Sequence, residues 1–238
     1  MSRPKAVMGE RAAKSALFAE YAAVGKALAN PGRLELLDLL AQGPRGVDQL
    51  AEAAGLGVTT CSAHLQALRE AGLVRSVREG KRVINVLSDD AVATLLVDLR
   101  TVASRQRPAT DIARDTYLGP DDTQAITRAE LLDRARAGDL VILDVRPGIE
   151  YAAAHLPGAM NIPLDELVAR LDELPADTEI VAYCRGAYCA MAHEAVRVLV
   201  AHGYHARRAQ DGILEWRSDG IVRSASASAG RHLPADHG

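Results

Sequence analysis

The sequence holds only three cysteines and no long apolar run, and both shortages limit what the protein can be. Three cysteines cannot build the disulfide framework of a small secreted domain, so each is expected to be reactive, metal-binding or buried. No apolar stretch approaches the ~20 residues that a membrane-spanning helix needs. Residues 1–15 lack the apolar core and small-residue cleavage site of a signal peptide. The sequence therefore predicts a cytoplasmic protein with no membrane partner.

The charge is unevenly distributed along the 238 residues, whose formal net charge is −3. Residues 1–110 contain 15 Lys and Arg against 11 Asp and Glu, whereas residues 111–238 contain 13 against 20. A basic region attracts polyanions such as DNA, and an acidic region is repelled by them. The length is sufficient for two domains that each bury a core. We therefore expect the first half, rather than the second, to meet a nucleic acid.

Apolar periodicity and capping residues predict five helices and one hairpin in the first half. In chain order they cover residues 10–28, 30–44, 46–57 and 59–72, then the hairpin 73–87 and the helix 89–107. Asn30 and Pro31 are typical of a helix start, and Glu79-Gly80 between two β-branched runs is typical of a hairpin turn. This order of elements is that of a winged helix-turn-helix.

The second half begins with a polar segment, 111–124, which we expect to be a linker. From residue 125 onward, predicted strands alternate with predicted helices, which indicates a parallel sheet. The strands are expected at 140–145, 179–184 and 205–212, and the helices at 164–174 and 189–203. Residues 224–238 have low hydrophobicity and are expected to be disordered.

The stretch TTCSAHLQALREAGLV resembles the recognition helix of ArsR-type winged-helix repressors, and the resemblance runs from about Val24 to Val102. It implies a symmetric homodimer that places this helix in the major groove of operator DNA. Short polar side chains at the start of such a helix reach base edges. The candidates for this contact are Thr59, Thr60, Ser62, His64 and Gln66. Leu65 and Leu68 are expected to face the core, and supporting the packing is an alternative role for His64.

Four cations lie within eight residues of the predicted wing: Arg75, Arg78, Lys81 and Arg82. Such side chains neutralise phosphates and release counterions, so that affinity for DNA falls steeply with salt. The alternative is an ordinary hairpin with a solvated charged face.

The metal-binding residues of many ArsR-type repressors have no counterpart here. The resemblance places Ala51 and Ala53 about where thiolate ligands would lie, and the helix 89–107 contains no histidine. Borderline and soft metals require thiolate or imidazole ligands. We therefore predict no metal and no cofactor. Cys61 is expected to be a small buried hydrophobe, with a redox role as the alternative.

The stretch LVILDVRPGIEYAAAHLPGAMNIP resembles the first signature of rhodanese-type sulfurtransferases, and AYCRGAYC followed by DGILEWRSDGIV resembles the second. The resemblance covers about Ala125 to Val222 and implies an α/β domain with a central parallel sheet. It also implies that Cys184 carries a persulfide, while Asp144, Arg146 and His155 hold the first motif together.

The residues around Cys184 predict an activated thiol. A loop between a strand and a helix directs backbone N–H groups and the helix N-terminus toward an anion inside it. These features lower a thiol pKa, and Arg185 adds a positive charge. The active-site loop also includes Gly186, Ala187 and Tyr188.

This loop departs from the family pattern, which places its glycine three residues after the cysteine and ends in arginine or threonine. Here Gly186 follows two residues after Cys184, and Cys189 stands at the final position. A thiol cannot replace a guanidinium in receiving an anionic donor such as thiosulfate. It can instead attack a persulfide and close a disulfide. The alternatives are a purely structural cysteine pair and a metal site with His193 as third ligand.

The sequence thus predicts a mainly-α winged helix-turn-helix, residues 1–110, followed by a linker and a rhodanese-like domain, residues 125–223. We interpret the chain as a DNA-binding transcriptional regulator that senses reactive sulfur or an oxidant through Cys184, with Cys189 as a possible second thiol. Its expected small-molecule partners are a sulfane-sulfur or oxyanion donor and a thiol acceptor. The alternative is an enzyme, either a sulfurtransferase or an arsenate reductase, that carries a regulatory DNA-binding domain.

Overall fold

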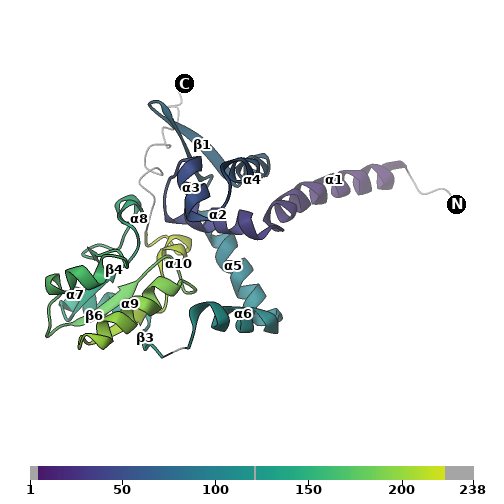
Figure 1. Ribbon diagram of the computed structural model, residues 1–238. Helices are drawn as coiled ribbons and strands as arrows, with labels where there is room; N and C mark the ends of the chain where they lie inside the picture. The colour runs from purple at the N-terminus through teal and green to yellow at the C-terminus, as the bar shows by residue number, and fades with distance from the viewer. Residues whose placement is uncertain (1–4, 121, 223–238) are drawn as a thin grey trace, which may run out of the picture. The chain divides into compact units, whose positions relative to one another are not determined.

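The computed structural model describes residues 5–120 and 122–222, shown as the coloured ribbon of Figure 1. The chain forms two compact units. The first contains the residues up to Leu40 together with Pro44–Val92, and the second contains Ala41–Gly43 and the residues from Ala93 onward. No helix within the described ranges is long and apolar enough to cross a membrane. The tail expected to be disordered, residues 224–238, lies outside the described residues.

The first unit is the predicted winged helix-turn-helix. Its elements are α1 (Lys5–Leu28), α2 (Pro31–Gln42), α3 (Val47–Ala53), α4 (Val58–Glu70), β1 (Val74–Glu79) and β2 (Arg82–Leu87). The Asn30 side chain caps α2 by accepting the Arg33 N–H at 3.1 Å, as expected. β1 and β2 pair antiparallel around a two-residue turn in which Gly80 has φ 61°. Such a turn needs positive φ, which glycine adopts without strain.

Leucines from three helices of the first unit form its core. Leu36, Leu50, Leu65 and Leu68 are all buried, which confirms the predicted inward pair on α4. The hairpin is fixed to this core through Asn85, whose side chain donates to the Arg45 carbonyl and accepts from Arg69 on α4 at 3.2 Å. Helix α4 and the wing are therefore held by both apolar packing and buried hydrogen bonds.

Two helices join the wing to the sheet domain. Helix α5 (Ala91–Gln106) begins where Asp89 accepts the Ala91 N–H at 2.8 Å, and α6 (Pro108–Leu118) follows. The segment expected to be a linker therefore begins as a helix. Pro108 occupies a first-turn position, and Gly119, with φ 74°, ends the helix.

The rest of the second unit is a five-stranded parallel sheet of order β3-β7-β6-β4-β5. The strands are β3 (Ala125–Ile126), β4 (Leu140–Asp144), β5 (Met160–Asn161), β6 (Glu179–Tyr183) and β7 (Ala206–Ala209). The helices are α7 (Arg128–Ala137), α8 (Gly148–Ala153), α9 (Ala190–Ala201) and α10 (Ile213–Ser218), together with the 3-10 helix η1 (Leu167–Glu173). The predicted helix at 164–174 is thus a 3-10 helix, and the predicted parallel sheet is confirmed.

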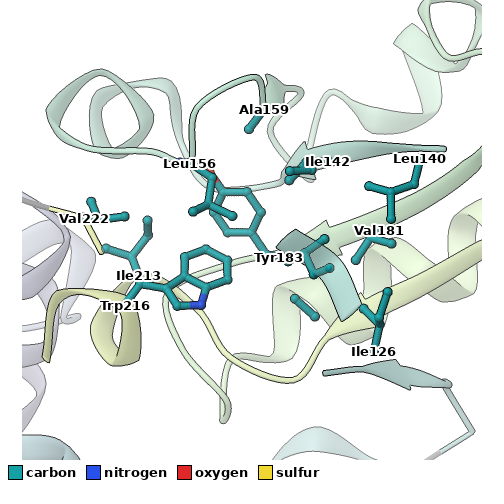
Figure 2. Close-up of a cluster of buried hydrophobic side chains, with 12 residues drawn as sticks. Ile126, Leu140, Ile142, Leu156, Ala159, Val181, Tyr183, Ile213, Trp216 and Val222 are labelled. Carbon is teal, nitrogen blue, oxygen red and sulfur yellow. The ribbon is translucent and has the colours of Figure 1, made fainter. Parts of the chain in front are cut away.

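The two faces of the sheet follow from the alternation of side chains along β6. Val181 and Tyr183 point to one face, where Tyr183 meets Trp216 of α10 edge to face at 4.9 Å between ring centroids (Figure 2). Ile180 and Ala182 point to the other face, which α9 and η1 cover. Cys184, the next residue of that second series, therefore enters the core beneath α9.

A buried ion pair stands at the end of β4. The Arg146 guanidinium and the Asp144 carboxylate are fully buried and lie 2.6 Å apart. Asp144 also accepts the Arg146 N–H at 3.0 Å, and Arg146 donates to the Ala154 carbonyl at 2.7 Å. The predicted scaffold role of these two residues is consistent with this closed network. Removing one partner would leave the other charge buried and uncompensated.

Asp144→Ala should therefore destabilise the sheet domain by about 3–5 kcal/mol. Trp216 is the single tryptophan of the sequence and is buried in this domain, so its fluorescence during urea unfolding reports on the domain directly. Asp133→Ala is the matched control, because its ion pair with Arg136 is exposed and is worth about 0–1 kcal/mol. Equal losses in the two variants would contradict the structural role of the buried pair.

Candidate functional site

Four of the five candidate base-contacting side chains on helix α4 are exposed. Thr59, Thr60, Ser62 and Gln66 are exposed, whereas His64 is half-buried. A methyl group placed on Gly32 of α2 would lie 3.2 Å from the His64 Nε2. His64 thus packs against the start of α2, which favours the alternative role in packing that the sequence left open.

The wing cations are all exposed, but they do not share one face. Arg75 and Arg82 lie on the same face of the hairpin, because Arg82 pairs with Glu79 and side chains alternate along β1. Arg78 lies on the opposite face, and Lys81 is in the turn. The positive charges of the wing are therefore spread over both faces of the hairpin and its turn.

Cys61 is fully buried on the inner side of α4, with its Sγ 3.7 Å from the Val47 carbonyl. Burial raises the pKa of its thiol, and the carboxylate of Asp48 adds to the effect. This environment confirms the predicted small buried hydrophobe and disfavours reactivity.

The second group of predicted residues is the cysteine loop, residues 184–189, between β6 and α9. Cys189 is the N-cap residue of α9, so the positive end of the helix dipole lies at the loop. Helix α10 holds the loop through two backbone hydrogen bonds. The Ile213 N–H donates to the Cys184 carbonyl at 3.2 Å, and the Leu214 N–H donates to the Arg185 carbonyl at 2.9 Å.

Gly212 permits this contact because it has no side chain. A methyl group there would collide with the Cys184 carbonyl and lie 2.7 Å from the Gly186 Cα. Any larger residue would displace the loop from α10. Gly212 is thus a structural requirement of the cysteine loop.

The two loop thiols are free and interact directly. Burial, with Cys189 beside it, raises the pKa of Cys184. The hydrogen bond from Cys184 lowers the pKa of Cys189, and the backbone N–H groups of Arg185 and Met191 add to this effect. The expected lowering of the Cys184 pKa is therefore wrong, because the strand carries its side chain into the core. Cys189 is therefore the more acidic thiol of the pair, and it is also the more exposed of the two.

The Arg185 side chain has a partner that the sequence analysis did not assign. Its Nη2 lies 2.6 Å from Oε1 of Glu150, whose side chain is fully buried in α8. The positive charge is thus compensated by a carboxylate, and it lowers the Cys189 pKa less than the Cys184 thiol and the backbone N–H groups do. Arg185 joins the first motif to the loop more than it activates a thiol.

Two further residues contact the loop and were missed. Glu215 of α10 accepts the Gly212 N–H at 2.9 Å and the Ala187 N–H, and burial raises its pKa. Ser104 of α5 shares a hydrogen bond of 3.1 Å with the Tyr188 hydroxyl. Glu215 lies inside the quoted second motif, but Ser104 stands in a distant helix and belongs to no motif, so it carries no local signal.

The third ligand of the alternative metal site is engaged elsewhere. His193 is buried, and its Nδ1 lies 3.2 Å from the Thr123 hydroxyl. Across the described residues, 5–120 and 122–222, no group of three or more His, Cys, Asp or Glu side chains is arranged to hold a metal ion. His155, expected in the scaffold, is exposed and stacks on Tyr151 at 3.9 Å.

The asymmetric thiol pair predicts which cysteine is alkylated first. At neutral pH, iodoacetamide should modify Cys189 before Cys184, as located by mass spectrometry. Because the Cys189 pKa is lowered, the reaction rate should stay high below pH about 8.5, the usual pKa of a cysteine, and fall only as pH drops through the lower value. Preferential labelling of Cys184 would contradict this assignment.

Comparison with known families matches both halves of the chain. The family described as bacterial regulatory protein, arsR family, matches residues 30–76, and the rhodanese-like domain family matches residues 127–219. The cysteine loop and the residues that hold it lie within the second match.

Individual relatives extend this result. HTH-type transcriptional regulator Rv0324 of Mycobacterium tuberculosis is 49% identical over 223 residues, which are 93% of this chain and 98% of that protein. A sulfurtransferase of Allochromatium vinosum is 30% identical over 84 residues, which are 35% of this chain and 77% of that protein. The solution structure of the homodimeric winged helix-turn-helix DNA-binding domain Mb0332 of Mycobacterium bovis is 47% identical, covers 40% of this chain and 89% of that chain, and has a TM-score of 0.38.

The regulator aligns along nearly the whole chain, and the two family matches fall on the two folds described above. The chain therefore belongs to the ArsR family of bacterial regulatory proteins and is a transcriptional regulator in which a rhodanese-like domain follows the winged helix-turn-helix.

Proposed function

We propose that this regulator binds operator DNA as a homodimer and that sulfane sulfur, reacting at Cys184 and Cys189, changes its affinity for that DNA. The observation that carries the proposal is the hydrogen bond of 3.1 Å between Tyr188 of the cysteine loop and Ser104 of α5. Three residues separate helix α5 from the wing strand β2. A change in the loop thus acts on the helix that continues from the wing.

The exposed side chains of the first unit support DNA binding by a dimer. The recognition helix and the wing present polar and cationic side chains to solvent. Helix α1 exposes apolar side chains at Leu17, Phe18 and Tyr21, each more than half accessible. Such a face is suited to burial against a second copy, and the Mycobacterium bovis domain that is 47% identical is described as homodimeric.

The thiol pair supports the sulfur chemistry. In the resting state the Cys184 S–H donates to the Cys189 carbonyl at 3.5 Å, and Cys189, the more acidic thiol, supplies the thiolate that can take up the Cys184 proton. Transfer of that proton to Cys189 leaves a Cys184 thiolate, which attacks the sulfane sulfur of a donor R–S–SH and releases RS⁻. The RS⁻ takes the proton back from Cys189. The Cys189 thiolate then attacks the Cys184 sulfur and expels HS⁻, which leaves a disulfide. The sulfane sulfur is reduced to sulfide while the two thiols are oxidised, so no further oxidant is needed.

The loop contacts explain how disulfide formation would change the position of Tyr188 relative to α5. Closing a disulfide between Cys184 and Cys189 draws the two ends of the loop together, and Tyr188 is the residue immediately before Cys189. The loop cannot yield toward α10, because Gly212 already lies in close contact with Gly186. Movement is therefore directed at the Tyr188–Ser104 contact. A coupling free energy of about 1–3 kcal/mol is typical of linked sites.

A catalytic sulfurtransferase is the second candidate, favoured by the identity to the Allochromatium protein of that name. Cys189 at the end of the loop argues for single loading, because it ends the reaction in a disulfide. Repeated turnover with thiosulfate and cyanide would support the enzyme, and one sulfur transferred per chain would support the sensor.

The wing provides a test of the DNA-binding part. Lys81→Ala should weaken binding to the DNA upstream of the protein's own gene and lower the slope of log affinity against log salt by about 1, as expected for one lost phosphate contact. Arg136→Ala is the matched control, because it removes an exposed cation of the sheet domain. An unchanged slope for Lys81→Ala would place the hairpin turn away from the phosphates.

The sensing part is tested by measuring the affinity for the same DNA, at fixed salt, with and without a polysulfide donor. The wild-type protein should shift its affinity by about 5–150-fold, and dithiothreitol should reverse the shift. Cys184→Ser should bind DNA normally and show no shift, because neither persulfide nor disulfide can form at that position.

Tyr188→Phe separates chemistry from transmission. It removes the hydroxyl that meets Ser104 but leaves both thiols in place. The variant should form the disulfide at the wild-type rate, as seen by mass spectrometry, while its DNA affinity changes much less. A full affinity shift in Cys184→Ser would disprove sensing through the loop, and a full shift in Tyr188→Phe would disprove transmission through α5.

A further inference from the structure

A cavity of about 700 Å³ opens beside the cysteine loop, within the second unit. The loop contributes Ala187 and Tyr188 to its wall, and α9 and the end of β7 contribute His193, Arg208 and Gln210. The opposite wall is the end of α6 and the two residues after it, from Arg114 to Pro120. That wall precedes residue 127, where the rhodanese-like match begins. Half of the residues that line the cavity therefore lie outside the rhodanese-like match.

Hydrogen bonds hold this additional wall in place. Arg197 of α9 donates to the Pro120 carbonyl at 2.8 Å and to Asp122 at 3.0 Å. Thr123 is buried and lies between two cavity residues, with its hydroxyl 3.1 Å from the Arg208 Nε and 3.2 Å from the His193 Nδ1. Because Arg208 can only donate, Thr123 accepts from it and can donate to His193. The cavity is thus a constructed site with fixed polar groups.

The charges that line the cavity are mixed. Arg114 and Arg208 supply guanidinium groups, and Asp115 supplies a carboxylate 2.9 Å from Arg114. Asp111, which is outside the lining, also pairs with Arg114 at 2.9 Å, so a ligand carboxylate would compete with two side-chain carboxylates for this guanidinium. Guanidinium groups bind carboxylates in a paired geometry, and a carboxylate binds an ammonium group. A ligand that carries both charges satisfies this lining, whereas a simple inorganic anion would meet Asp115 unfavourably. The volume lies in the range of small-molecule sites, about 300–1,000 Å³.

We propose that this cavity binds a small zwitterionic thiol, of the cysteine or glutathione class, and that this thiol restores the reduced loop. The proposal rests on the disulfide of the proposed function. Tyr188 lines the cavity, and the next residue along the chain is Cys189. The bound thiolate attacks the Cys189 sulfur, which forms a mixed disulfide and releases the Cys184 thiolate. A second thiol then attacks the sulfur of the bound ligand, yields the free disulfide, and leaves Cys189 as a thiolate.

The first test uses S-methylglutathione, which has the charges of glutathione but cannot react. Titration of the reduced full-length protein should show saturable binding, and Arg114→Ala should weaken it about tenfold, as expected for a lost hydrogen bond to a charged group. Arg114 lies on the surface of α6, so the variant should fold. Arg136→Ala, the exposed-cation control, should bind as the wild type does. Absence of binding to the wild-type protein would overturn the proposal.

The second test measures how quickly the loop is reduced after oxidation with diamide. Arg114→Ala should slow reduction by glutathione about tenfold and leave reduction by 2-mercaptoethanol unchanged, because the latter is uncharged and gains nothing from the cavity. Equal slowing with both reductants would show that the substitution disturbs the loop itself and would overturn the proposal. Binding of S-methylglutathione in a protein whose DNA affinity ignores polysulfide would leave the cavity assigned and refute only the sensor.

Discussion

The close contact between Gly212 and the cysteine loop is the constraint on which the rest of the site depends. It brings the backbone of the β7–α10 turn against Cys184 and Gly186, so that α10 can bind two loop carbonyls. With the loop held on that side and with α9 starting at Cys189, the two thiols have few positions available. The Cys184 thiol donates to the Cys189 carbonyl at 3.5 Å. The two thiols are inequivalent, because one is carried into the core by the strand and the other stands at a helix N-terminus.

This arrangement accounts for a loop that differs from the family pattern. A loop ending in arginine presents a cation to its donor, whereas this one ends in a second thiol, and its one arginine is neutralised by the buried Glu150. The hydrogen bond between Tyr188 and Ser104 connects the loop to α5, the helix that follows the wing in the chain. The geometry therefore suits one reaction that alters a contact more than it suits repeated transfer of sulfur.

Much of this could be predicted from the sequence, because the informative signals are local. Capping at Asn30, the turn at Gly80 and the spacing of Leu65 and Leu68 depend on a few neighbouring residues, and the structure confirms each of them. The helical form of the segment after Pro108 was missed, since its polar composition resembles a linker. The two-residue strands β3 and β5 were missed because they are defined by pairing with distant strands rather than by a pattern of their own.

The sequence by itself determined the two folds, their order, and the presence of two thiols on one loop, because periodicity and motif spacing are properties of neighbouring residues. The tertiary structure decided how deeply each thiol is buried and in which direction its pKa is shifted. The alternation of β6 buries Cys184 beneath α9 and raises its pKa, and helix α9 receives Cys189 as its N-cap residue and keeps its pKa low. It also brought Ser104 to Tyr188 and Thr123 to His193 across 84 and 70 residues of chain. Burial and long-range contact depend on the whole fold, so no local pattern could reveal them.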